Sequence, residues 1–206
     1  MKPDFERCRR LATQLLLRQN KAALQTDVRS LTFDRPVLID SLQNYARLTH
    51  TPCSLLTSSL HWLDGGTLVW GNTRVVLYDH TQKNDRRINW TLAHEIGHIY
   101  LEHTEDGPLQ EIEAHFFAAQ LLMPEVLVQY LAAHHPRSQQ NTLTRRDLTT
   151  CFGVSNLAAQ KRLDSLCPSA GSCSGEEQFL LQRCMPALNQ YLLSCRRRSI
   201  SVSMLD

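Results

Sequence analysis

The sequence predicts an α+β fold in which a small antiparallel sheet packs on one long helix and further helices follow. Residues 53–80 are rich in Leu, Val, Trp, Tyr and Thr and contain turn dipeptides, a pattern typical of strands. Residues 88–134 carry apolar residues at helical spacing, interrupted at Pro108 and Pro124. Residues 142–166 then follow a helix–turn–helix rhythm.

Length and composition indicate one compact domain, or one domain with a small appendage. The chain has 206 residues, of which 42% are apolar, so it can form a core of ordinary size and is not disordered as a whole. A net charge of +2 argues against a protein that binds nucleic acid through its overall charge. The charge is uneven, because residues 31–141 are acidic and both flanks are basic.

Targeting features favour a cytoplasmic protein without a membrane association. Residues 1–7 lack the apolar run of a secretory signal, and no apolar run reaches the roughly 18 residues of a membrane span. The seven cysteines include no Cys-x-x-Cys pair, so we expect reduced thiols.

Four segments are expected along the chain. They are an N-terminal helical segment (1–34), a core that carries the chemistry (35–136), a helix–turn–helix-like region (142–166), and a linker with a C-terminal helix of unknown role (167–206). The expected helices cover 5–25, a short stretch from 38 to 48, 88–102, 109–122, a stretch ending at 134, and 177–195. The expected strands cover 53–57, 67–70 and 73–78, with 61–63 as a further strand or a loop.

Within the strand region, Gly71-Asn72 is a dipeptide that closes two-residue hairpins. The strand from Arg74 to Tyr78 either binds an extended substrate by strand addition or is an ordinary strand of the sheet. In the helix–turn–helix-like region, Lys161 and Arg162 could contact DNA, but the modest charge density favours a packing or docking role.

The strongest chemical signal is the run His94-Glu95-Ile96-Gly97-His98. Two histidines four residues apart emerge from one face of a helix, one turn apart, and can bind one Zn²⁺. Glu95 is placed to accept a proton from the attacking water and to pass it to the leaving amine. Gly97 keeps the helix slim where a strand or a substrate approaches.

A catalytic zinc needs a third protein ligand as well as an open position. The positions that hold a third ligand in one class of such enzymes are Leu101 and Thr104 here, so the ligand comes from elsewhere. Thirteen residues beyond His98, an antiparallel helix offers Glu111 as the first choice, whereas Glu113 points away and is expected to be solvated.

Several neighbouring residues have an open role. His115 lies one turn beyond Glu111 and is either a hydrogen-bonding partner of the ligands or a core residue. His103 and Tyr100 could stabilise an oxyanion, although a histidine in the last turn of a helix is also favoured by the helix dipole.

The run from Thr91 to His98, together with the segment from Glu111 to Pro124, resembles the ImmA/IrrE family of metallopeptidases. The likeness covers roughly residues 35–166 and implies a zincin-like fold around the His-Glu-x-x-His helix, with Glu111 as the zinc ligand. Where the family usually has Asn or Asp, this chain has His115.

The resemblance also implies a function: a zinc endopeptidase that cleaves a helix–turn–helix repressor and so derepresses mobile-element or stress genes. We expect one zinc per chain, although a ligand set of two histidines and a glutamate accepts other divalent metals too. The alternatives are a non-enzymatic zinc-containing regulator that acts through its helix–turn–helix-like segment, and a broad-specificity housekeeping peptidase.

Overall fold

The computed structural model describes residues 2–60, 64–105, 107–136, 143–166 and 173–203. The chain divides into two compact units, one formed by Met1–Leu15 with Asp27–Ala118 and the other by Leu16–Thr26 with Ala119–Asp206. The first unit holds the sheet, and the elements described in the second unit are helices, so the predicted α+β class is confirmed.

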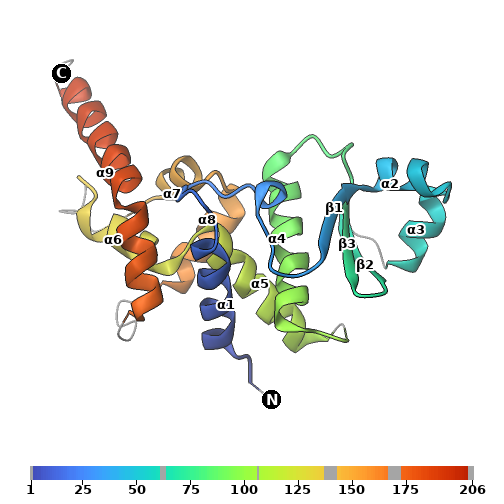
Figure 1. The fold of residues 1–206 in the computed structure, drawn as a ribbon. Helices are drawn as coiled ribbons and strands as arrows, with labels where there is room; N and C mark the ends of the chain where they lie inside the picture. Colours follow the sequence, from blue (N-terminus) through green and yellow to red (C-terminus); the bar gives the residue numbers. More distant parts are fainter. Residues whose placement is uncertain (1, 61–63, 106, 137–142, 167–172, 204–206) are drawn as a thin grey trace. The chain divides into compact units, whose positions relative to one another are not determined.

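The first unit is built around a three-stranded sheet (Figure 1). In chain order its elements are α1 (Phe5–Leu17), the 3-10 helix η1 (Val28–Ser30), β1 (Val37–Ser41), α2 (Leu42–Thr49), α3 (Cys53–Ser59), β2 (Gly65–Trp70), β3 (Thr73–Tyr78), α4 (Asp85–Leu101) and α5 (Pro108–Leu122). The last residues of α1 and α5 belong to the second unit.

The sheet is mixed, which corrects the predicted antiparallel sheet. Its strand order is β1-β3-β2, with β2 antiparallel to β3 and β1 parallel to β3. A parallel pair needs a long crossover, and α2, α3 and β2 provide it between β1 and β3. The Gly71-Asn72 hairpin between β2 and β3 forms as predicted, with Trp70 opposite Thr73.

The expected helix around residues 38–48 begins later than its apolar pattern suggested. Val37–Ser41 form β1, and the helix α2 starts at Leu42, where the Ser41 side chain accepts a hydrogen bond from the Asn44 N–H. Ser41 therefore caps the helix. Leu38 and Ile39, two and three residues after Pro36, belong to the strand. The sequence pattern assigned their apolar side chains to the helix.

Residues 53–57, predicted as a strand, lie in the helix α3. The carbonyl of Pro52 accepts the N–H groups of Leu55 and Leu56, which opens the helix directly after the proline. Leu56 is buried in a cluster with α2 and β3 residues. A short apolar run does not distinguish helix from strand by its periodicity. Residues 61–63, the further strand or loop, lie outside the described residues.

Strand β3 is the centre of the sheet and is covered on both faces. Val75 and Leu77 pack with Leu42 and Leu56 of α2 and α3, whereas the fully buried Val76 points to the opposite face, where α4 packs. Both edges of β3 are paired, so the substrate-binding alternative for residues 74–78 is wrong, and β1 and β2 are the edge strands.

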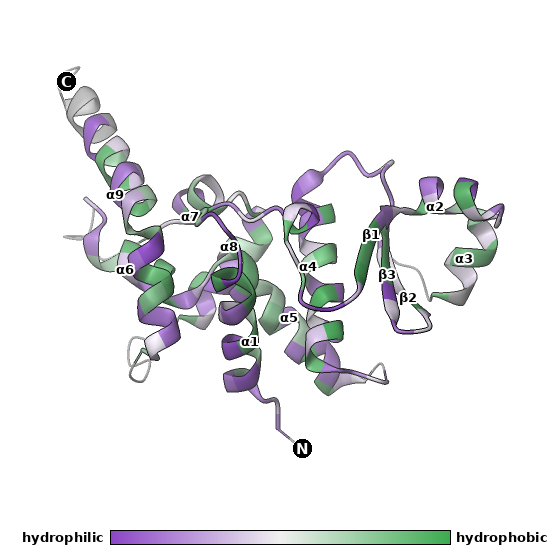
Figure 2. Ribbon diagram, in the orientation of Figure 1, coloured by the Kyte–Doolittle hydropathy of each residue, from purple (hydrophilic) through white to green (hydrophobic). Residues whose placement is uncertain are grey.

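Helix α4 follows a hydrophilic segment, which Figure 2 colours purple between β3 and the helix. The Asn84 side chain accepts the Arg87 N–H and starts the helix one turn earlier than predicted. Its end is set by Glu102, which adopts the left-handed conformation (φ 60°) and donates its N–H to the carbonyls of His98 and Ile99.

The second unit contains α6 (Glu125–His134), α7 (Arg145–Phe152), α8 (Asn156–Ser165) and α9 (Gly175–Ser203). α7 and α8 form the predicted helix–turn–helix, with Gly153 at the turn and Ser155 capping α8. α9 includes Pro186 and extends beyond the predicted 177–195 at both ends.

Two arginines of this unit bind backbone carbonyls. Arg162 is 3% exposed and donates from Nε and Nη2 to the Met123 carbonyl. The sequence suggested this arginine as a DNA contact, but its side chain is buried and bound within the protein. Arg183 donates to the carbonyls of Leu17 and Gln19, just where α1 ends, eight residues earlier than predicted.

No single helix of the described residues is both long and apolar enough to cross a membrane. By length and composition alone, α5 and α6 taken together pass that test, but they are bent by 51° at the break between them.

Candidate metal centre

Helix α4 presents His94 and His98 from one face, and their Nε2 atoms are 3.0 Å apart. The opposite face of the helix, which includes Leu92 and Ile96, is fully buried. Both imidazoles are 14% exposed. Packing of the apolar face therefore fixes the direction in which the two histidines point.

Gly97 lies where α5 crosses α4. A Cβ atom at this position would lie 3.2 Å from the Cα atom and the carbonyl oxygen of Ala114, and 3.2 Å from Phe117 Cδ1. Real Cβ atoms rarely approach backbone so closely. The partner that needs this slim helix is thus α5, not the strand or substrate that the sequence suggested, and its close approach brings Glu111 to the histidine pair.

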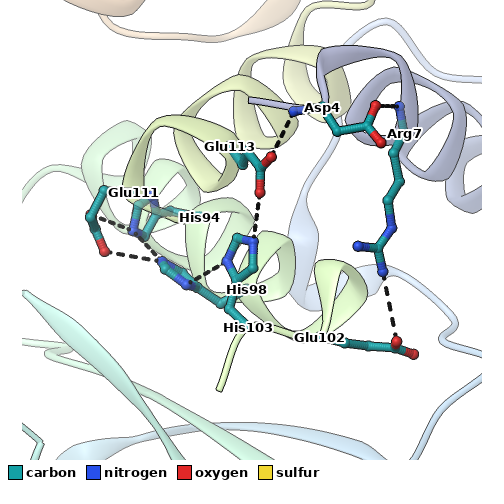
Figure 3. Close-up of polar contacts among 8 residues, drawn as sticks. All are labelled: Asp4, Arg7, His94, His98, Glu102, His103, Glu111 and Glu113. Carbon is teal, nitrogen blue, oxygen red and sulfur yellow. Dashed lines mark hydrogen bonds and ion pairs between the residues drawn. The ribbon is translucent and has the colours of Figure 1, made fainter. Parts of the chain in front are cut away.

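Glu111 bridges the two imidazoles (Figure 3). Its Oε2 is 3.4 Å from His94 Nε2, and its Oε1 is 3.3 Å from His98 Nε2. Ligand atoms at about 2.0–2.1 Å from a tetrahedral zinc are separated by about 3.3 Å. The two imidazole nitrogens are 3.0 Å apart, and each lies 3.3 or 3.4 Å from a different oxygen of the Glu111 carboxylate, spacings close to those around one zinc ion.

His115 offers a second donor set around the same point. Ligand atoms of His94, Glu111 and His115 all lie within 4.8 Å of one another. The ring of His115 is exposed, and its centroid is 4.5 Å from that of His94. The spacing of the set with His98 matches the edge of a zinc tetrahedron more closely, so we favour His98 as the ligand and His115 as a neighbour of His94.

Burial acts strongly on His94. Desolvation, followed by the neighbouring imidazoles of His98, His115 and His103, lowers the pKa of His94 from 6.5 to about 3. The imidazole is therefore neutral near pH 7, which is the form that binds a metal.

Thr67 is a site residue that the sequence analysis missed. It lies on β2 opposite Val76, so its side chain is on the sheet face that packs against α4. Thr67 Oγ1 donates a 2.6 Å hydrogen bond to Glu95 Oε2. The register of the β2–β3 hairpin, which cannot be read from a motif, thus supplies the residue that orients the candidate base.

His103 lies behind His98 rather than in front of the metal position. Its Nδ1 is 3.1 Å from His98 Nδ1, and its Nε2 is 3.0 Å from Glu113 Oε2. Glu113 was expected to be solvated, but its side chain is only 12% exposed, which overturns that prediction. Glu102 ends α4 in the left-handed conformation, and His103, the next residue, makes the contact with Glu113 of α5.

Tyr100 does not reach the metal position. It is 3% exposed, its hydroxyl donates to Asp34, and burial together with this bond raises its pKa. Its ring lies under the guanidinium of Arg35 and beside Phe117. These contacts indicate a packing role instead of oxyanion stabilisation.

A cleft of about 870 Å³ opens over the imidazoles. One wall is β2, which contributes Gly65, Gly66, Thr67 and Val69, and the floor includes the His94–His98 turn of α4 with Glu111 and His115. Among the described residues the outer edge of β2 pairs with no strand. The cleft therefore combines a cluster of metal-binding side chains with an open strand edge.

A family model described as IrrE N-terminal-like domain, peptidase M78, matches residues 51–164, more than half of the chain. The match includes all three favoured ligands, the candidate base, α7 and all but the last residue of α8. No curated protein matches the chain.

Proposed function

The chain belongs to the peptidase M78 family of metallopeptidases, and from this premise we propose that it is a zinc-dependent endopeptidase acting on a protein. The observation that carries the proposal is the convergence of His94 Nε2, His98 Nε2 and the Glu111 carboxylate at the spacing of a zinc tetrahedron. A zinc ion there would be held by these three residues, one ion per chain.

When bound, zinc polarises the scissile carbonyl and lowers the pKa of the attacking water. Glu95 accepts the proton of that water and then delivers it to the leaving amine. Thr67 holds one oxygen of Glu95 in place, which limits rotation of the carboxylate and keeps the base aimed at the cleft. A purely structural metal site needs no such base, which favours an enzyme over the non-enzymatic regulator.

The substrate segment binds extended along the outer edge of β2. This strand lines the cleft beside the imidazoles, and its unpaired backbone groups offer the hydrogen bonds of strand addition. Backbone recognition needs an unfolded or extended segment of the substrate, which selects a loop or linker of the target protein.

We propose that this target is a helix–turn–helix repressor, as the resemblance to the ImmA/IrrE family implies, and that its cleavage derepresses mobile-element or stress genes. The chain's own helix–turn–helix is less suited to DNA because the buried Arg162 is bound to a backbone carbonyl. We assign α7 and α8 to packing or substrate docking.

The test is an incubation of the zinc-loaded protein with purified helix–turn–helix repressors from the same organism, analysed by intact mass spectrometry. We expect two fragments from a single cut with the wild type, and none with Glu95→Gln at the same zinc content. Cuts at many sites in unrelated unfolded proteins would favour the housekeeping peptidase. Equal cleavage by Glu95→Gln would refute the assignment of the base.

A further inference from the structure

A chain of polar contacts leads from His98 to the N-terminal helix (Figure 3). His98 Nδ1 contacts His103 Nδ1 at 3.1 Å, and His103 Nε2 contacts Glu113 Oε2 at 3.0 Å. Glu113 Oε1 in turn accepts the backbone N–H of Asp4 at 2.7 Å. His103 and Glu113 are 7% and 12% exposed, so water competes little with these contacts.

The direction of each hydrogen bond follows from the acceptor at the end of the chain. An ionised carboxylate only accepts, so His103 Nε2 carries a proton, and in the neutral imidazole its Nδ1 is then the bare nitrogen. His98 must then donate from Nδ1, which leaves the lone pair on its Nε2. That nitrogen is the one that faces His94 and Glu111.

We propose that Glu113 and His103 are positioning residues that hold His98 in the tautomer and the orientation needed to bind zinc. The inference rests on the proposed function, because it takes the three favoured ligands as the metal site. Hydrogen-bonding partners behind a metal-bound histidine typically contribute 10–100-fold to metal affinity. Here that partner is a second histidine, held by a carboxylate two residues beyond the ligand Glu111.

The N-terminal helix α1 completes this support from outside the region that the family model matches. Besides the Asp4 N–H, its first turn places the ring of Phe5 4.5 Å from that of Phe116 on α5. Arg7 lies 3.6 Å from Glu102, the residue that ends α4. The first turn of α1 thus contacts both helices that carry the ligands.

A carboxylate at position 113 is needed because two donors converge on it. His103 Nε2–H approaches one oxygen and the Asp4 N–H approaches the other. A glutamine has one acceptor oxygen and one NH₂ group, so one of the two donors would face another donor. Glu113→Gln therefore removes the contact pattern with almost no change in volume.

The experiment measures zinc affinity by competition with a chromophoric chelator for wild type, Glu113→Gln, His103→Ala and the double variant. Glu105→Gln is the matched control, since Glu105 is exposed on the same loop and makes none of these contacts. Thermal unfolding of each metal-free protein provides a separate readout of stability.

We expect each single variant to bind zinc 10–100-fold more weakly than wild type, and Glu105→Gln to bind it equally well. The double variant is expected to bind no more weakly than the weaker single variant, because the two residues act in series. If Glu113→Gln does not fold, the zinc affinity of His103→Ala alone tests the positioning role.

Wild-type affinity in folded His103→Ala and Glu113→Gln, with or without a lower unfolding temperature, would overturn the positioning role while leaving the proposed function intact. Failure of the wild type to bind zinc would instead overturn the proposed function and this inference with it.

Discussion

The two imidazoles of α4 differ in what lies behind them. His98 Nδ1 contacts His103, His103 contacts Glu113, and Glu113 accepts the backbone N–H of Asp4, just before α1. His94 Nδ1 is buried and has no hydrogen-bond partner among the described residues. A buried donor without a partner costs about 1–3 kcal/mol. Hydrogen bonds therefore support the imidazole at the end of α4, whereas one turn earlier the Nδ1 of His94 has none among the described residues and the ring of the exposed His115 lies 4.5 Å away.

This contrast indicates that the two histidines contribute unequally to preorganisation. On the His98 side the tautomer is set before any metal binds, whereas on the His94 side burial, followed by the neighbouring imidazoles, keeps the ring neutral. Variants on the two sides should consequently have different effects on zinc affinity, and variants of the base should affect activity alone.

The largest effect is expected for Glu95→Gln. Loss of the general base should reduce kcat by about 10²–10⁴-fold, since that is the usual contribution of general-base catalysis. Zinc content should stay at the wild-type value, because Glu95 is not among the favoured ligands. Single-turnover cleavage together with metal analysis checks both parts, and a variant that also loses zinc would place Glu95 among the ligands.

The contrast between His94 and His98 is tested by comparing the zinc affinity of His115→Ala with that of His103→Ala. We expect His115→Ala to keep the zinc affinity of wild type within a few-fold, whereas His103→Ala weakens it by about 10–100-fold. Chelator competition measures both affinities. The reverse order would mean that His115 replaces His98 as the second imidazole ligand and that the set of His94, Glu111 and His115 holds the metal.

A smaller effect is expected at Thr67. Thr67→Val removes the hydrogen bond to Glu95 and should lower kcat about tenfold, because a hydrogen bond to a charged group contributes about 1.5–3 kcal/mol. Thr67→Ser retains the hydroxyl and should restore most of the rate. Equal rates for the Val and Ser variants would show that the hydroxyl does not orient the base.

The smallest expected change concerns stability. Gly97→Ala inserts a methyl group 3.2 Å from the backbone of Ala114 and should destabilise the fold by about 1–3 kcal/mol, in the range of overpacked cores. Gly175→Ala, with nothing within 4 Å of its added Cβ, is the control. Urea unfolding compares the two, and a Gly97→Ala protein as stable as the control would argue against the close approach of α5.

Local patterns predicted the parts of the molecule that depend on short sequence separations. The helical spacing of His94 and His98, the return helix with Glu111, the hairpin at Gly71 and the turn at Gly153 all follow from residues close to each other in the sequence. Short-range sequence patterns determine such features, so they can be predicted without knowledge of the fold.

The features that sequence analysis missed depend on distant partners. Thr67 reaches Glu95 only through the β2–β3 register, and Glu113 is buried only because His103 and the distant Asp4 contact it. Residues 37–41 and 53–57 were misassigned for a related reason, since tertiary pairing with β3 and packing on it decide short apolar runs.

The most direct test of the account is the zinc content of the purified wild type, Glu111→Ala and Glu113→Ala. The two carboxylates are two residues apart on α5 and take different parts in the site, one between the imidazoles and one behind His103. We predict about one zinc in wild type, none in Glu111→Ala, and zinc that is retained but bound more weakly in Glu113→Ala. Full retention of zinc by Glu111→Ala would contradict the ligand assignment.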